Sequence, residues 1–197
     1  MRRIKTFIVT VTLCAGAASA SASTITVNDP LWYEFSWNPG AMVTGCDPAD
    51  TGGLPCVESD GGNSQLAAAP AWTFALAAGG SFEVTDAFIG TDRFEVFDFG
   101  VSLGLTSAPS GSASCGSNPV SCLADPLISH GAFSLAGGNH SITIQHSGPT
   151  QGAAYFRVLE SSALDSREAP EPATLGLMGM GLIGLIARSR RSSRKDS

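Results

Sequence analysis

The feature that most constrains the fold of this chain is a series of short runs rich in aromatic and β-branched residues. In HSITIQH (140–146), Ile142 and Ile144 alternate with polar residues, as in a strand with one buried face. Glycine, asparagine, aspartate and proline, which favour turns, separate the runs. Similar runs lie at 24–27, 31–37, 72–76, 81–88, 93–104, 131–137 and 154–160. Eight such strands predict an all-β fold, an antiparallel β-sandwich or jelly-roll-like domain at 23–160.

Two of these runs share a short repeat. Phe82-Glu83-Val84 recurs as Phe94-Glu95-Val96 twelve residues later. The segment FIGTDR between them contains Gly90 and Asp92, which suit a tight turn. We therefore expect the two strands to pair as a hairpin.

The aromatic residues at 32, 33, 37 and 72 are the largest in these runs. Trp32, Tyr33, Trp37 and Trp72 are predicted to lie in the core, where such side chains bury the most apolar surface. The alternative is that one or two of them form a platform on which a sugar ring stacks.

The N-terminus has the order of regions found in a secretory signal peptide. Residues 1–5 carry three basic residues, 6–16 are apolar, and small residues follow. We expect export by the Sec machinery and cleavage by signal peptidase after Ala22, with Ala20 as the alternative, so that residues 1–22 are removed. An ordinary buried N-terminal helix or strand would not need these three regions in this order.

The segment between the two basic ends of the chain is strongly acidic. Residues 23–172 contain sixteen acidic and three basic residues, a net charge of −13. Such a surface disfavours nucleic acid and anionic membranes as partners.

The cysteines predict two local disulfides. Cys14 leaves with the signal peptide, and the remaining four form two pairs close in sequence, Cys46 with Cys56 and Cys115 with Cys122. Export makes disulfides available, and proximity favours these pairs among the three possible connectivities. A metal site is the alternative, but neither pair has C-x2-C spacing and no histidine lies at zinc-ligand spacing.

Four carboxylates occur within thirteen residues: Asp86, Asp92, Glu95 and Asp98. Such oxygen ligands can hold Ca²⁺, and a pair of carboxylates can act as acid and base in glycoside hydrolysis. Because no D-x-D-x-D-G loop accompanies them, solvated turns and outward strand positions are the favoured interpretation. We therefore predict no resident cofactor, with Ca²⁺ at these four residues as the alternative.

The histidines do not predict a catalytic centre. His140 and His146 share a strand face, but six residues of strand separate them by about 20 Å, too far for one metal ion. Ser129 precedes His130 but lacks the G-x-S-x-G context of a nucleophile. We expect that the chain is not an enzyme.

The C-terminal segment consists of three parts after a linker at 161–169. Pro170, Glu171 and Pro172 precede an uncharged apolar run at 173–187, and a basic tail follows at 188–195. As a helix the run is about 22 Å long, short for a hydrocarbon core of about 30 Å. The basic tail should remain cytoplasmic, with the acidic domain outside. The alternative is a buried C-terminal core helix.

The order of these parts resembles the PEP-CTERM sorting signal at residues 170–195. The resemblance implies that exosortase, an integral-membrane cysteine transpeptidase, recognises Pro170, Glu171 and Pro172 and cleaves nearby. It also implies a precursor in the inner membrane of a bacterium with an outer membrane, and a final place in the cell envelope, at the cell surface or in the extracellular matrix. Ala169 stands where the family often has valine.

The stretches at 82–107 and 129–144 are similar to a pattern in many exported proteins with this tail, which implies a β-sandwich module. Proteins with this signal are associated with extracellular polysaccharide and biofilm. The expected function is a structural or adhesive role in that matrix. A carbohydrate-binding module, with or without Ca²⁺, is the alternative, followed by a secreted hydrolase.

Overall fold

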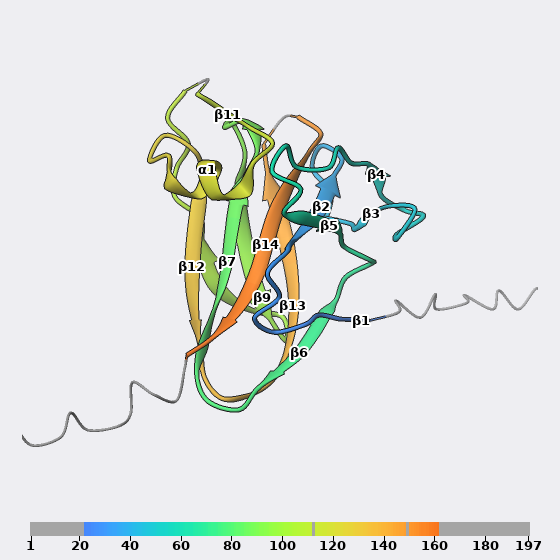
Figure 1. Ribbon diagram of the computed structural model, residues 1–197, viewed down its shortest axis with the longest axis vertical. Coiled ribbons are helices and arrows are strands. Elements are labelled where there is room, and N and C mark those ends of the chain that lie inside the picture. Colours follow the sequence, from blue (N-terminus) through green and yellow to red (C-terminus); the bar gives the residue numbers. More distant parts are fainter. Residues whose placement is uncertain (1–21, 112, 149, 162–197) are drawn as a thin grey trace, which may run out of the picture.

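The alternating runs form two facing five-stranded β-sheets in the computed structural model, which describes residues 22–111, 113–148 and 150–161 (Figure 1). The strand order of the first sheet is β1 (Ser23–Thr24), β6 (Trp72–Leu76), β13 (Gly138–Ser147), β9 (Arg93–Asp98) and β10 (Val101–Leu105). That of the second is β12 (His130–Leu135), β7 (Gly80–Asp86), β14 (Gly152–Glu160), β2 (Trp32–Trp37) and β5 (Ser64–Leu66). The all-β prediction is confirmed.

The sheets are mixed, although the sequence predicts antiparallel ones. At the edges β1 pairs with β6 and β2 pairs with β5 in parallel, while the central ladders are antiparallel. Two short ladders complete the strands: β3 (Cys46–Asp47) with β4 (Leu54–Pro55), and β8 (Phe88–Ile89) with β11 (Ser114–Gly116).

The one helix in the described part of the chain is α1 (Pro119–Ala124). It begins after Asn118, whose side chain accepts a hydrogen bond from the backbone N–H of Val120. Within residues 22–111, 113–148 and 150–161, no helix is long and apolar enough to cross a membrane.

The core lies between the two sheets, where aromatic rings from both meet. Phe35 of β2 contacts Phe94 of β9 edge to face, with ring centroids 5.5 Å apart. Trp72 of β6 packs on Phe156 of β14 at 4.4 Å. The aromatic residues for which we predicted burial are all at most 8% exposed: Trp32, Tyr33, Trp37 and Trp72. Their burial confirms that these side chains lie inside and excludes a surface sugar platform built from them. Tyr33, Trp37 and Trp72 belong to the core between the sheets, whereas Trp32 packs with Ala87 and Tyr155 in a separate small cluster.

The predicted hairpin of β7 and β9 is wrong. β7 pairs with β12 and β14 in the second sheet, whereas β9 pairs with β10 and β13 in the first. Phe82 and Phe94, the first residues of the repeat, are both fully buried in the common core. The repeat therefore marks two strands that present the same inward pattern from opposite sheets, and the segment between them crosses from one sheet to the other.

The hairpin of this region lies instead within the run 93–104. β9 and β10 pair antiparallel around Phe99 and Gly100. Both residues have positive φ, +47° and +78°, as a tight turn between twisted strands requires.

Several predicted segments lie outside the described residues. These are the signal peptide except Ala22, the linker 161–169 except Ser161, and the sorting signal 170–195 with its apolar run 173–187.

Candidate functional site

A pocket of about 310 Å³ lies at the end of the sandwich where β14 begins. Trp37, Phe88 and Ile89 supply apolar surface, and Asp86, Asp92 and Thr150 supply polar groups. An apolar pocket with a few converging polar groups is the usual form of a small-molecule site.

Asp86 is the last residue of β7 and is only 1% exposed. One of its carboxyl oxygens accepts a hydrogen bond from the N–H of Ala87 at 2.9 Å, and the other from the N–H of Asp92 at 3.2 Å. Burial raises the pKa of Asp86 to about 8, and the nearby charge of Asp92 adds to this effect. At neutral pH the carboxyl group is therefore mostly protonated and able to donate a hydrogen bond.

Asp92 is held by the side chains of His146 and Thr150, of which Thr150 also lines the pocket. His146 Nε2 donates to Asp92 Oδ1 at 2.7 Å, and the Thr150 hydroxyl lies 2.9 Å from both carboxylate oxygens. His146 stacks on Trp37 with ring centroids 5.0 Å apart, and its Nδ1 is buried without a hydrogen-bond partner among the described residues. A Cβ at position 148 would overlap Asp92 Oδ1, so the close approach of this loop requires Gly148.

The structure divides the four predicted carboxylates among three places. Asp86 and Asp92 lie together at the pocket, and their burial shows that the expectation of solvated turns is wrong for these two. Glu95 accepts a hydrogen bond from Ser102 at 2.6 Å. Asp98 accepts hydrogen bonds from His140 at 2.8 Å and from the N–H of Ser141 at 2.9 Å.

This division separates the four carboxylates too widely for one ion. Asp92 immediately precedes β9 and Asp98 ends it, and six residues of strand span about 20 Å. The four groups therefore do not form one Ca²⁺ site.

His140 and His146 lie on the same face of their strand, as their even spacing in the sequence predicts. His140 and His146 are both buried on the inward face of β13, each paired with a different carboxylate. Sequence reasoning missed the pair of His146 with Asp92, which are 54 residues apart. The available signal was the alternation with Ile142 and Ile144, because a histidine on a buried face needs a hydrogen-bond partner.

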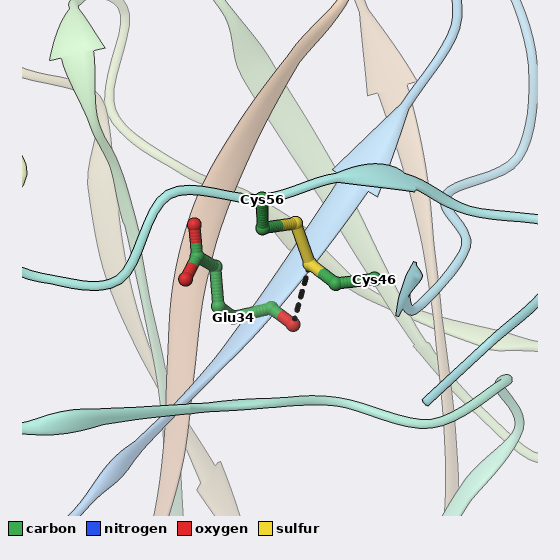
Figure 2. Close-up of side chains that lie close together, drawn as sticks. All are labelled: Glu34, Cys46 and Cys56. Atoms are coloured by element: carbon green, nitrogen blue, oxygen red, sulfur yellow. Dashed lines mark hydrogen bonds between the residues drawn. A yellow bond between two sulfur atoms is a disulfide. The ribbon is translucent and has the colours of Figure 1, made fainter. Parts of the chain in front are cut away.

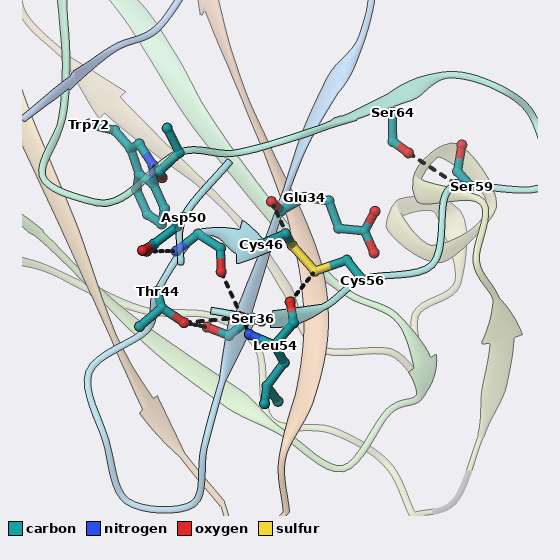
Figure 3. Close-up of a disulfide and its surroundings, with 12 residues drawn as sticks. Glu34, Ser36, Thr44, Cys46, Asp50, Leu54, Cys56, Ser59, Ser64 and Trp72 are labelled. Atoms are coloured by element: carbon teal, nitrogen blue, oxygen red, sulfur yellow. Dashed lines mark hydrogen bonds between the residues drawn. A yellow bond between two sulfur atoms is a disulfide. The ribbon is translucent and has the colours of Figure 1, made fainter. Parts of the chain in front are cut away.

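Both predicted disulfides are present. Cys46 of β3 is bonded to Cys56, which follows β4, and Cys115 of β11 is bonded to Cys122 of α1. Around the first disulfide, the hydroxyl of Ser36 accepts a hydrogen bond from the N–H of Leu54 at 2.9 Å and joins β2 to this loop (Figure 3).

A third residue, which sequence reasoning missed, lies beside the first disulfide. Glu34 of β2 extends along the disulfide, and its carboxylate and the two sulfur atoms lie within 4.8 Å of one another (Figure 2). Among the described residues this is the one group of three side chains with the spacing of metal ligands. The sulfur atoms are bonded to each other, so thiolate ligands are not free in this state.

The sorting residues Pro170, Glu171 and Pro172 lie outside the described residues. A family model, the PEP-CTERM protein-sorting motif, matches residues 168–191, which include all three and the whole apolar run. Comparisons with curated proteins and with solved structures found no match. The motif accounts for the order of the C-terminal segments: the chain carries a PEP-CTERM sorting signal, which marks an exported substrate of exosortase at the cell envelope of Gram-negative bacteria.

Proposed function

We propose that this protein is a structural or adhesive component of the extracellular polysaccharide matrix, displayed with its pocket facing away from the membrane. The sorting motif at 168–191 supports the matrix role, and the direction of β14 supports the orientation of the pocket. The strand begins at Gly152, which lines the pocket, and ends at Glu160, ten residues before Pro170. Figure 1 shows its C-terminal end at the opposite end of the sandwich from α1 and β11.

The length of β14 sets the distance between pocket and attachment. Nine residues of strand span about 26 Å, most of the length of a small sandwich. During export the apolar run would hold the precursor in the inner membrane, with the pocket at the far end of the domain. Cleavage near Pro170–Pro172 would then release or transfer the domain. This proposal assigns the chain no enzymatic activity.

Replacing Pro170, Glu171 and Pro172 by alanines in the host tests the sorting step. Uncleaved precursor should accumulate in the inner-membrane fraction, while a control with Ser161 and Ser162 replaced by alanines should be processed as usual. Unchanged processing and surface display of the triple variant would contradict this pathway. A matrix role further predicts that deletion of the gene reduces the protein-dependent cohesion of the polysaccharide, measured by shear release of cells.

Carbohydrate binding in the pocket is the second candidate. It is favoured by the apolar surface of Phe88 and Ile89 beside the polar groups of Asp86, Asp92 and Thr150. On a glycan array the exported chain should bind a defined set of sugars, and Thr150→Val should weaken this binding. The matched control is Thr73→Val, because Thr73 lies on β6, outside the residues that line this pocket. If no glycan on the array bound, carbohydrate binding would be refuted and the structural role would remain as the proposal.

A further inference from the structure

Glu34 is buried in an arrangement that needs an explanation. It lies in the middle of β2, is 0% exposed, and neither of its carboxylate oxygens has a well-formed hydrogen bond among the described residues, although the backbone N–H of Val57 lies near enough to lower its pKa. Tyr155 lies directly opposite it in the ladder of β14 with β2, and its hydroxyl is also buried without a partner. Polar groups left unpaired in a protein interior destabilise the folded state.

The group that shares this enclosed space is the disulfide of Cys46 and Cys56. Its sulfur atoms and the Glu34 carboxylate lie within 4.8 Å of one another (Figure 2). Cys46 is fully buried, and its sulfur contacts the backbone carbonyl of Glu34 at 3.2 Å. Cys56 is half-buried and lines a second pocket, of about 290 Å³, beside residues 151–153.

The second disulfide lacks this environment. Among the described residues, no carboxylate lies close to both sulfur atoms of Cys115 and Cys122. Glu34 does lie this close to the sulfur atoms of the first disulfide. The Cys122 sulfur instead lies 3.5 Å from the backbone carbonyl of Gly116. The first disulfide therefore has an adjacent buried carboxyl group that the second lacks.

We propose that the Cys46–Cys56 disulfide undergoes thiol–disulfide exchange, and that Glu34 is the proton donor for its buried sulfur. The co-reactant is a dithiol reductant. Its thiolate attacks Cys56 Sγ from the pocket, a mixed disulfide forms, and the Cys46–Cys56 bond breaks. The electron pair of that bond passes to Cys46 Sγ, which takes the proton from Glu34. The second thiol of the reductant then loses its proton to solvent and its sulfur displaces Cys56, which leaves as a thiolate and takes a proton from solvent. The reductant ends as its disulfide, and both cysteines are reduced.

The surroundings of Glu34 suit this step. A thiolate on fully buried Cys46 is unfavourable, and protonation removes its charge. Burial raises the pKa of Glu34 to about 7; the backbone N–H of Val57 acts against this shift and the charge of Glu58 adds to it, so a proton is available at neutral pH. Burial, with the charges of Glu34 and Asp60, raises the pKa of Tyr155, which keeps its proton and can donate to the carboxylate that remains.

The test is the reduction of each disulfide by excess dithiothreitol between pH 5 and 9, followed by alkylation and mass spectrometry of the exported chain. Rates are divided by the thiolate fraction of the reductant. In the wild type, the corrected rate for Cys46–Cys56 should fall as pH rises through about 7, because Glu34 loses its proton. The corrected rate for Cys115–Cys122 should stay level. This comparison needs no variant.

Glu34→Gln should slow reduction of Cys46–Cys56 by about tenfold or more below pH 7 and remove its pH dependence. Glu58→Gln is the matched control, because it removes a neighbouring exposed carboxylate but keeps the proton donor. It should retain the wild-type rate at low pH and the fall with pH, with that fall moved slightly to lower pH because Glu58 helps to raise the pKa of Glu34. Identical corrected profiles for the two wild-type disulfides would overturn the proposal. Equal rates and profiles in the wild type and a folded Glu34→Gln variant would overturn it as well.

Discussion

Replacing Asp86 by asparagine should change how the stability of the domain depends on pH. The folded state raises the pKa of Asp86 from 3.8 to about 8, so the native protein keeps a proton that the unfolded chain releases. Stability from this residue is therefore greatest below pH 3.8, falls as pH rises, and reaches its minimum above about pH 8. This trend is opposite to that of a carboxylate held in an ion pair.

The magnitude follows from the difference between the two states. Each pH unit between the two pKa values lowers the free energy of unfolding by about 1.4 kcal/mol, so the loss reaches about 4 kcal/mol at pH 7. Asparagine does not ionise, but its single carbonyl oxygen can replace only one of the two acceptors that bind Ala87 and Asp92. That lost hydrogen bond costs about 1–3 kcal/mol. The variant should therefore be about 2 kcal/mol more stable than the wild type at pH 7.

Urea unfolding followed by tryptophan fluorescence at pH 5, 6, 7 and 8 measures this effect. Between pH 5 and 7 the fall in stability should be smaller in Asp86→Asn than in the wild type by about 1.4 kcal/mol for each pH unit, and the difference between pH 7 and 8 should be about 1 kcal/mol, because the folded state begins to lose the proton as well. Asp47→Asn is the matched control, because Asp47 is exposed and should leave the slope unchanged. An Asp86→Asn variant with the wild-type slope would show that burial does not hold a proton at this position.

Three further predictions concern packing and metal. Gly148→Ala should destabilise the domain by about 1–3 kcal/mol in urea unfolding, because the new methyl group meets Asp92 and His146; a neutral effect would mean that the loop moves freely. Phe94→Ala should cost about 3–5 kcal/mol in the same assay, since Phe94 is fully buried between the sheets, and a loss below 1 kcal/mol would contradict its place in the core. Adding EDTA or Ca²⁺ should leave the melting temperature unchanged because the carboxylates of 86–98 are divided among three places; a rise of several degrees with Ca²⁺ would refute this.

The sequence predicted the elements whose pattern depends on local burial. In β13, Ile142 and Ile144 lie inward as their alternation indicates, and His146 follows the same parity. The pairing of strands was not available from that pattern. Phe82 and Phe94 have the same neighbours in sequence whether their strands pair side by side or face each other across a core, and only the tertiary structure distinguishes these arrangements.

The polar groups of the candidate sites were harder to predict for a related reason. Glu34 alternates with Tyr33 and Phe35, which is the pattern of a polar residue on a solvent-facing surface. The segment that contains Cys56 covers that face, so the residue is fully buried. Asp92 likewise lies in a loop whose sequence predicts an exposed turn, and His146, to which it is hydrogen-bonded, is 54 residues away in the sequence. When a loop distant in sequence covers a polar residue, the hydrophobic pattern around that residue does not change, so the sequence does not predict its burial.

The position of β14 has a mechanical consequence for a protein held by its C-terminus. The strand lies in the middle of its sheet, with antiparallel ladders to β7 on one side and to β2 on the other. Tension between a ligand at the Gly152 end and an attachment beyond Glu160 would act along the strand. The hydrogen bonds of both ladders would then be loaded together in shear, whereas an edge strand can be peeled away one bond at a time. The last strand before the sorting segment is thus the one that the sheet holds from both sides against a pulling force.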